Sequence, residues 1–159
     1  MLDSLPQVPW STFSQPLDNE PEAVPRALEA LRDSTTREEA HSSYNRVLYA
    51  VGNNHAGTYY PVVLEIVPFL GELLHHTSTL VRETTLDILV DLAGSFDPEP
   101  GFEKVLLMGE ARSLAVELLR AVGRINIDPS PAAGEDSCRR ECALRKELTE
   151  LVASGRSDE

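Results

Sequence analysis

The chain is poor in aromatic residues, cysteines and long apolar runs, and each shortage excludes a class of protein. Aromatic residues are 6% of the 159 residues, so aliphatic side chains must fill most of the core. Cys138 and Cys142, one helical turn apart, are too few for a disulfide framework and poorly placed for a bond. No window approaches the ~18–20 apolar residues of a membrane span. Because the N-terminus also lacks the pattern of a secretory signal, we expect a cytoplasmic protein with reduced thiols.

Basic residues are scarce relative to acidic ones. The chain has 14 Lys and Arg against 26 Asp and Glu, a formal net charge of −12. Such a chain repels a phosphate backbone, which argues against nucleic-acid binding as its main role. It would attract a basic protein partner and speed that encounter. Simple solubility is the alternative explanation of the same charge.

Motifs that carry chemistry are also missing. The sequence has no glycine-rich phosphate loop, no recognisable Ser/His/Asp set and no CxxC pair. His75 and His76 are adjacent, so on a helix end they point apart and cannot hold a metal together. We therefore predict no catalytic residue, no metal site and no cofactor.

Apolar residues recur at helical spacing along most of the chain, and no segment shows sustained strand alternation. The pattern predicts five or six helices, over about residues 21–32, 36–52, 60–74, 78–94, 103–127 (divided near Gly109) and 137–153. Short loops between them indicate antiparallel helix hairpins. We expect one all-α domain over residues 1–153, with an irregular arm at 1–19 and a disordered tail at 154–159. Trp10, in the arm, is expected to cover one end of the core, and the alternative is that it is exposed and anchors a partner.

Residues 53–95 carry the clearest signature. Pro68 lies inside a predicted helix, and Val81-Arg82 opens the next one. The full pattern is Pro68-Phe69-Leu70, Leu73-Leu74, a turn, and then Val81-Arg82, Thr85, Leu86, Leu89 and Leu92. This pattern resembles a HEAT repeat, which implies a short α-solenoid whose second helices line the concave surface. The turn departs from the family, because His75 to Ser78 stand where many HEAT repeats have an aspartate.

The loop Asn-Asn-His-Ala-Gly-Thr-Tyr-Tyr-Pro, residues 53–61, supports a narrower resemblance. It is similar to a segment of small bacterial HEAT-like proteins. Some members of that wider group resemble immunity proteins, which neutralise toxins delivered by contact-dependent or type VI secretion systems. The resemblance implies a cognate toxin domain as the partner.

Two groups of residues are candidates for contacting that partner. The loop offers hydrogen-bonding or amphipathic side chains at Asn53, Asn54, His55, Thr58 and Tyr59. The alternative is that these side chains cap helix ends in a fixed connection.

The second group is an acidic stripe. Glu83, Asp87 and Asp91 share one helix face because they are spaced by four residues. Like charges at this spacing cost a few tenths of a kcal/mol, which favours a use for them. An ordinary solvated face is the alternative.

These observations predict a non-enzymatic protein-binding module, in its sharpest form an immunity protein that binds a toxin with a basic surface. A scaffold or adaptor subunit of a bacterial complex is one alternative. An enzyme that uses His55 as a general base is another.

Overall fold

Helices dominate the chain. The computed structural model describes residues 1–20, 22–127 and 138–155. Within these ranges there are six α-helices: α1 (Ala23–Arg32), α2 (Arg37–Val51), α3 (Val63–Leu73), α4 (Thr79–Gly94), α5 (Leu114–Val122) and α6 (Cys138–Gly155). The predicted number of helices is confirmed. Helix α6 continues to Gly155, past the predicted start of the tail, and the linker at 128–136 and residues 156–159 lie outside the described residues.

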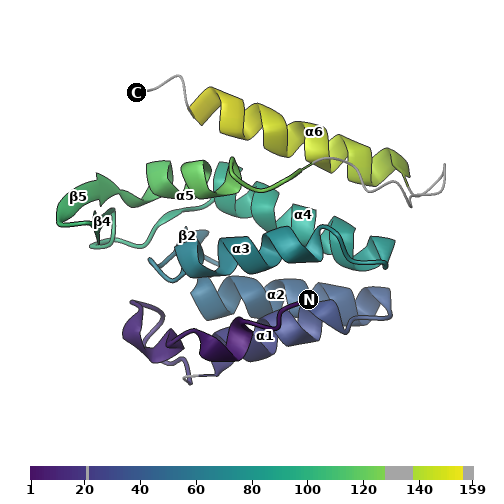
Figure 1. Ribbon diagram of the computed structural model, residues 1–159, viewed down its shortest axis with the longest axis horizontal. Helices are drawn as coiled ribbons and strands as arrows, with labels where there is room; N and C mark the ends of the chain where they lie inside the picture. The colour runs from purple at the N-terminus through teal and green to yellow at the C-terminus, as the bar shows by residue number, and fades with distance from the viewer. Residues whose placement is uncertain (21, 128–137, 156–159) are drawn as a thin grey trace.

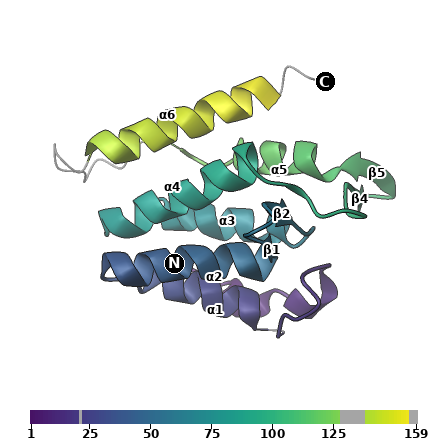
Figure 2. The ribbon, with the colours of Figure 1, turned by 180° about the vertical axis from the view of Figure 1, so that it is seen from behind.

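The helices stack in sequence order from α1 to α6 (Figures 1 and 2). Helix α4 packs against both α2 and α6, and α3 packs against both α1 and α5. The even-numbered helices therefore form one row and the odd-numbered helices the other. This arrangement decides which side chains from distant parts of the sequence come together.

The arm at the N-terminus closes one end of the core, as predicted. It forms two short 3-10 helices, η1 (Leu5–Gln7) and η2 (Trp10–Thr12). The Trp10 side chain is 6% exposed, and its ring centroid lies 5.8 Å from that of Phe69. Its indole N–H donates to the Leu5 carbonyl at 3.0 Å, so the one polar atom of the ring is satisfied where it is buried.

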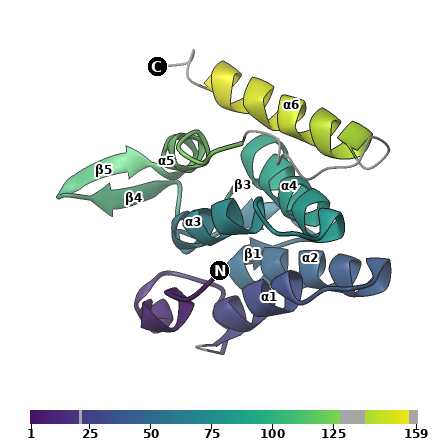
Figure 3. The same ribbon diagram turned by 45° about the vertical axis from the view of Figure 1, so that its right-hand side comes forward.

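Residues 104–113 form a β-hairpin, so the helical piece predicted before Gly109 is wrong. Strand β4 (Lys104–Leu107) pairs antiparallel with β5 (Glu110–Ser113). Met108 and Gly109 form the turn with φ of 53° and 84°. Positive φ at both central residues matches the twist of a two-residue hairpin, and glycine adopts it without strain. Figure 3 shows the hairpin extending away from the helices.

A second small sheet joins two loops. Strand β1 (Gly52–Asn53) pairs antiparallel with β2 (Thr58–Tyr59), which pairs in parallel with β3 (Asp97–Pro98). The fold is thus mostly helical with small sheets, and the prediction of a purely all-α chain is wrong. Strands of two residues are too short to show alternation, and they form because the loops after α2 and α4 satisfy each other's backbone groups.

A buried ion-pair network attaches α6 to the rest of the molecule. Arg82, Glu141 and Arg145 are 1%, 2% and 5% exposed. The Glu141 carboxylate accepts from Arg82 Nη2 at 2.9 Å and from Arg145 Nη2 at 2.6 Å. Burial alone would raise the pKa of Glu141, but the hydrogen bonds and charges of the two arginines outweigh it and hold that pKa below its usual range.

Both arginines also bind the carbonyl groups around them. Arg82 Nη1 donates to the carbonyls of His76 at 2.8 Å and Thr77 at 3.1 Å. Arg145 Nη1 donates to the Ile127 carbonyl at 2.7 Å. Arg82 therefore pairs with a carboxylate on α6. The turn between α3 and α4, which lacks the aspartate found in many HEAT repeats, binds Arg82 through backbone carbonyl oxygens.

Candidate functional site

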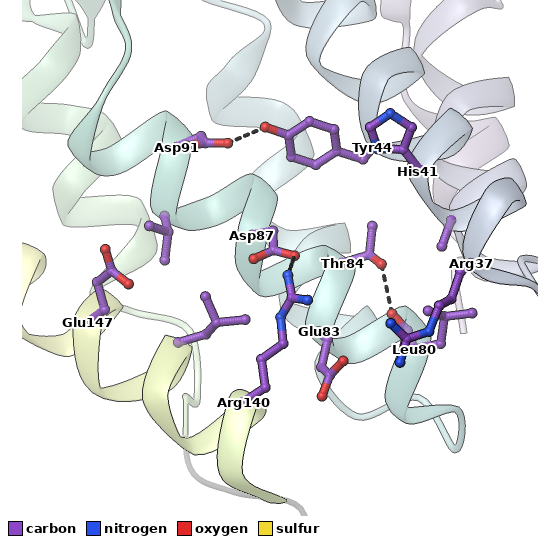
Figure 4. A pocket seen from close by; sticks show the side chains of 13 residues that line it. Arg37, His41, Tyr44, Leu80, Glu83, Thr84, Asp87, Asp91, Arg140 and Glu147 are labelled. Atoms are coloured by element: carbon purple, nitrogen blue, oxygen red, sulfur yellow. Dashed lines mark hydrogen bonds and ion pairs between the residues drawn. The ribbon is translucent and has the colours of Figure 1, made fainter. Parts of the chain in front are cut away.

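A groove of about 560 Å³ opens where α2, α4 and α6 meet (Figure 4). We call it the α2/α4/α6 groove. Carboxylates from α4 and α6 and guanidinium groups from α2 and α6 line it: Glu83, Asp87, Asp91 and Glu147 against Arg37 and Arg140. Ala40, Leu80, Val90 and Leu144 add apolar surface. Four acids against two arginines make the groove net negative.

The predicted acidic stripe on α4 lies in this groove. Asp87 accepts from Arg140 Nη2 at 2.8 Å, and Asp91 accepts a hydrogen bond from the Tyr44 hydroxyl. Glu83 has no hydrogen bond or ion pair to any residue that the structure describes. The i, i+4 spacing thus brings all three carboxylates to one surface, each with different partners.

Burial works against the charges of these groups. It raises the pKa of Asp87, although the Arg140 guanidinium opposes that shift. Burial also raises the pKa of Glu83. The pKa of Tyr44 is raised by burial first and then by its hydrogen bond to Asp91. A cation entering the groove would relieve the cost of keeping the carboxylates ionised.

The side chains that α2 and α6 contribute to the groove were not predicted. Arg37, His41 and Tyr44 follow helical spacing along α2, and Arg140 and Glu147 do so along α6. This spacing was a usable signal of a shared face. It could not show that both faces point at α4, because that depends on packing between helices far apart in sequence.

The predicted binding loop is held by hydrogen bonds within itself and to neighbouring parts of the chain. Asn53 Oδ1 accepts from the backbone amides of His55 at 3.1 Å and Ala56 at 3.2 Å. Asn54 Nδ2 donates to Asn45 Oδ1 at 2.8 Å, and the Thr58 hydroxyl donates to Glu99. These bonds are those of a fixed connection, the alternative explanation of the loop.

Two loop residues differ sharply in accessibility. Tyr59 is 1% exposed and belongs to the core, so its predicted contact with a partner is wrong. The pairing of the short strand β2 with β1 and β3 turns Tyr59 inward while leaving Thr58 half-buried. His55 is exposed, with its ring edge-on to Tyr49 at 5.5 Å. No hydrogen bond joins that ring to a carboxylate in the described part of the chain, so no acid orients it as a general base.

The loop lies next to the groove, at the C-terminal end of α2. Asn45 connects the two, because it accepts from Asn54 and its Nδ2 donates to the His41 carbonyl at 2.9 Å. Asn53 and His55 of the same loop are exposed, and neither lines the α2/α4/α6 groove itself.

Comparisons with protein-family models, with curated proteins and with solved structures found no match. Among residues 1–20, 22–127 and 138–155, no three His, Cys, Asp or Glu side chains are placed to hold a metal ion. No helix within these ranges combines the length and the apolar character needed to cross a bilayer.

Glu83→Gln is expected to raise the free energy of unfolding at pH 7. A carboxyl with a raised pKa binds more protons in the folded than in the unfolded state, so its contribution to stability falls as pH rises through the interval between the two pKa values. Glutamine removes this penalty, and the gain stays under about 1 kcal/mol because Glu83 is partly exposed. Urea unfolding should show the gain at pH 7 and no gain at pH 3.

The control is Glu29→Gln on the exposed face of α1, which should change stability little at either pH. A Glu83→Gln protein less stable than the wild type at pH 7 would show that the carboxylate stabilises the fold.

Proposed function

We propose that this chain is a short HEAT-like α-solenoid that binds another protein in its α2/α4/α6 groove and catalyses no reaction. In this proposal α1–α2, α3–α4 and α5–α6 are three repeats, and the second helix of each lines the concave side. The separation of odd and even helices into two rows supports it. So does the position of Pro68 inside α3 and of Arg82 at the start of α4.

The observation that carries the proposal is the meeting of acidic and apolar side chains from three helices in one groove. Such a surface suits a partner with basic residues beside apolar ones. The ion pair of Arg140 with Asp87 indicates how a guanidinium group can lie there. An arginine of the partner would compete for the same carboxylate.

In its sharpest form the proposal is a cytoplasmic immunity protein that occludes a cognate toxin domain with a basic surface. This step rests on the resemblance of the loop at residues 53–61. The loop residues Asn53, Asn54, His55 and Thr58 would contact the toxin at the end of the groove. A scaffold or adaptor subunit would use the same groove for a different partner.

Genetics separates the two roles. A gene for an immunity protein lies beside a toxin gene, and its deletion is lethal only while that toxin gene is intact. Co-expression of this chain in cells that produce the toxin domain should restore their growth. A silent deletion beside a housekeeping gene would refute the immunity role. If His55→Ala abolished a measured turnover while the protein stayed folded, the non-enzymatic proposal would fail instead.

Charge reversal at Glu83 and Asp87 is expected to weaken binding of the purified toxin domain about 30-fold or more, because each lysine replaces attraction by repulsion in a partly desolvated groove. Isothermal titration at low and at physiological salt would measure the change.

The matched control is Glu29→Lys with Glu38→Lys, which alters the net charge equally at exposed positions. If both double variants weaken binding to the same extent, net charge and not the groove determines affinity.

A further inference from the structure

A second groove, of about 580 Å³, lies between α3 and α5 and is separate from the surface proposed above. We call it the α3/α5 groove. Its wall is largely apolar, with Val67 from α3, Ala121 and Ile125 from the α5 region and Leu107 from the hairpin. Gly71 lets the segment that follows α5 approach α3 closely, since a Cβ at this position would lie 2.6 Å from Ile125 Cγ2. The groove is thus a built recess with an apolar wall.

Glu65 places a carboxylate in this apolar recess without a cation beside it. The side chain is half-buried and makes no hydrogen bond or ion pair with the residues that the structure describes. Burial raises its pKa, and no neighbouring charge contributes to that shift. A positive group from outside the chain would supply the missing partner.

The other charged groups of the α3/α5 groove are engaged or lie at its exposed rim. Glu72 accepts from the Leu2 amide at 2.6 Å. Glu117 accepts from Arg120 Nη1 at 2.6 Å. Arg124 and His75 are exposed, and no ion pair joins either to Glu65 in the described ranges. Glu65 is therefore the carboxylate that is open to a ligand.

Pro68 removes the usual helical donor of a backbone carbonyl in the same place. In a regular helix the backbone amide at position 68 would donate a hydrogen bond to the Leu64 carbonyl, but proline has no amide hydrogen to donate. Leu64, Glu65 and Pro68 all line the groove. The backbone oxygen of Leu64 and the carboxylate of Glu65 thus stand one residue apart, on the side of α3 where the proline interrupts the hydrogen-bond ladder.

We propose that the α3/α5 groove binds a lysine side chain of a partner polypeptide, with the ammonium group on Glu65 and the Leu64 carbonyl and the methylene stem along the apolar wall. A compact ammonium with three donors suits one carboxylate and one carbonyl, whereas the planar fork of arginine favours bidentate pairing. The four-carbon stem of lysine covers apolar surface while its head stays polar. The net charge of −12 favours the approach of such a segment.

The test is a methyl NMR titration of the full chain with two tripeptides, Ac-Val-Lys-Val-NH2 and Ac-Val-Nle-Val-NH2. Norleucine keeps the apolar stem and lacks the ammonium group. The lysine peptide should shift the methyl signals of Val67, Leu107 and Ile125, and the norleucine peptide should bind about tenfold more weakly. Equal affinity for the two peptides would overturn the proposal, as would shifts confined to Leu80, Val90 and Leu144 in the α2/α4/α6 groove.

Two variants assign the acceptors. Glu65→Gln should weaken the lysine peptide about tenfold and leave the norleucine peptide unchanged, because only the charge is removed. Pro68→Ala restores an amide donor to the Leu64 carbonyl and should weaken the lysine peptide about threefold. Unchanged lysine binding in Glu65→Gln would refute the site. Since neither variant touches the α2/α4/α6 groove, toxin binding there should survive both changes.

Discussion

Glu141→Ala is expected to lower the free energy of unfolding by about 3–5 kcal/mol, because it leaves two buried guanidinium groups without their shared carboxylate. Arg82 and Arg145 would keep their carbonyl partners, but those oxygens cannot neutralise two charges. Helix α6 would lose its main polar attachment to α4. Urea unfolding followed by circular dichroism at pH 7 measures the effect.

Glu147→Ala is the matched control, since it removes an exposed carboxylate from the same helix and should change stability by no more than about 0.5 kcal/mol. If Glu141→Ala costs less than about 1 kcal/mol, the network does not hold α6 in place. Limited proteolysis gives a second test. If α6 of the folded Glu141→Ala variant resists cleavage as well as α6 of the wild type does, that result would also contradict the expectation.

Trp10→Ala is expected to cost about 3–5 kcal/mol, the range for removing a buried tryptophan. The indole ring packs on Phe69 and Phe13, with its N–H bonded to Leu5, so truncation opens a cavity over one end of the core. Because Trp10 is the sole tryptophan, unfolding of the variant must be followed by circular dichroism.

Leu17→Ala in the same arm is the control, because Leu17 is 98% exposed and should contribute little. A loss below about 1 kcal/mol for Trp10→Ala would mean that the arm detaches from the core in solution. Fluorescence of the wild-type protein adds an independent check, since a buried indole emits at shorter wavelength than an exposed one.

The helices could be predicted because their apolar residues repeat locally. Val63, Ile66, Val67 and Leu70 recur at the helical period, and all four are buried in α3. The hairpin was missed because Val105, Leu106 and Leu107 form a short apolar run that fits a helix as well as a strand. The choice between helix and hairpin depends on the turn at Met108-Gly109, where both residues have positive φ.

The candidate site likewise has one feature that the sequence predicts and others that depend on the tertiary structure. The spacing of Glu83, Asp87 and Asp91 is enough to predict that they share one face, since i, i+4 geometry belongs to a single helix. Their surroundings depend on other helices: Tyr44 binds Asp91 from α2, and Arg140 binds Asp87 from α6. The binding role predicted for Tyr59 failed because the direction of a side chain in a two-residue strand depends on its pairing partners.

The stretch from Asn53 to Ser95 shows which structural features can be predicted from local sequence. Its residue pattern is sufficient to predict two helices, with a proline in the first, an acidic stripe on the second and a loop before them. The packing of the chain is needed to show that the loop is tied by hydrogen bonds and that Arg82 pairs with Glu141. It is needed as well to show that Glu65 faces a largely apolar groove with no ion-pair partner among the described residues. Helical periodicity acts over a few residues and can be read along the chain, whereas burial and charge pairing depend on contacts such as that of Arg82 with Glu141, 59 positions apart.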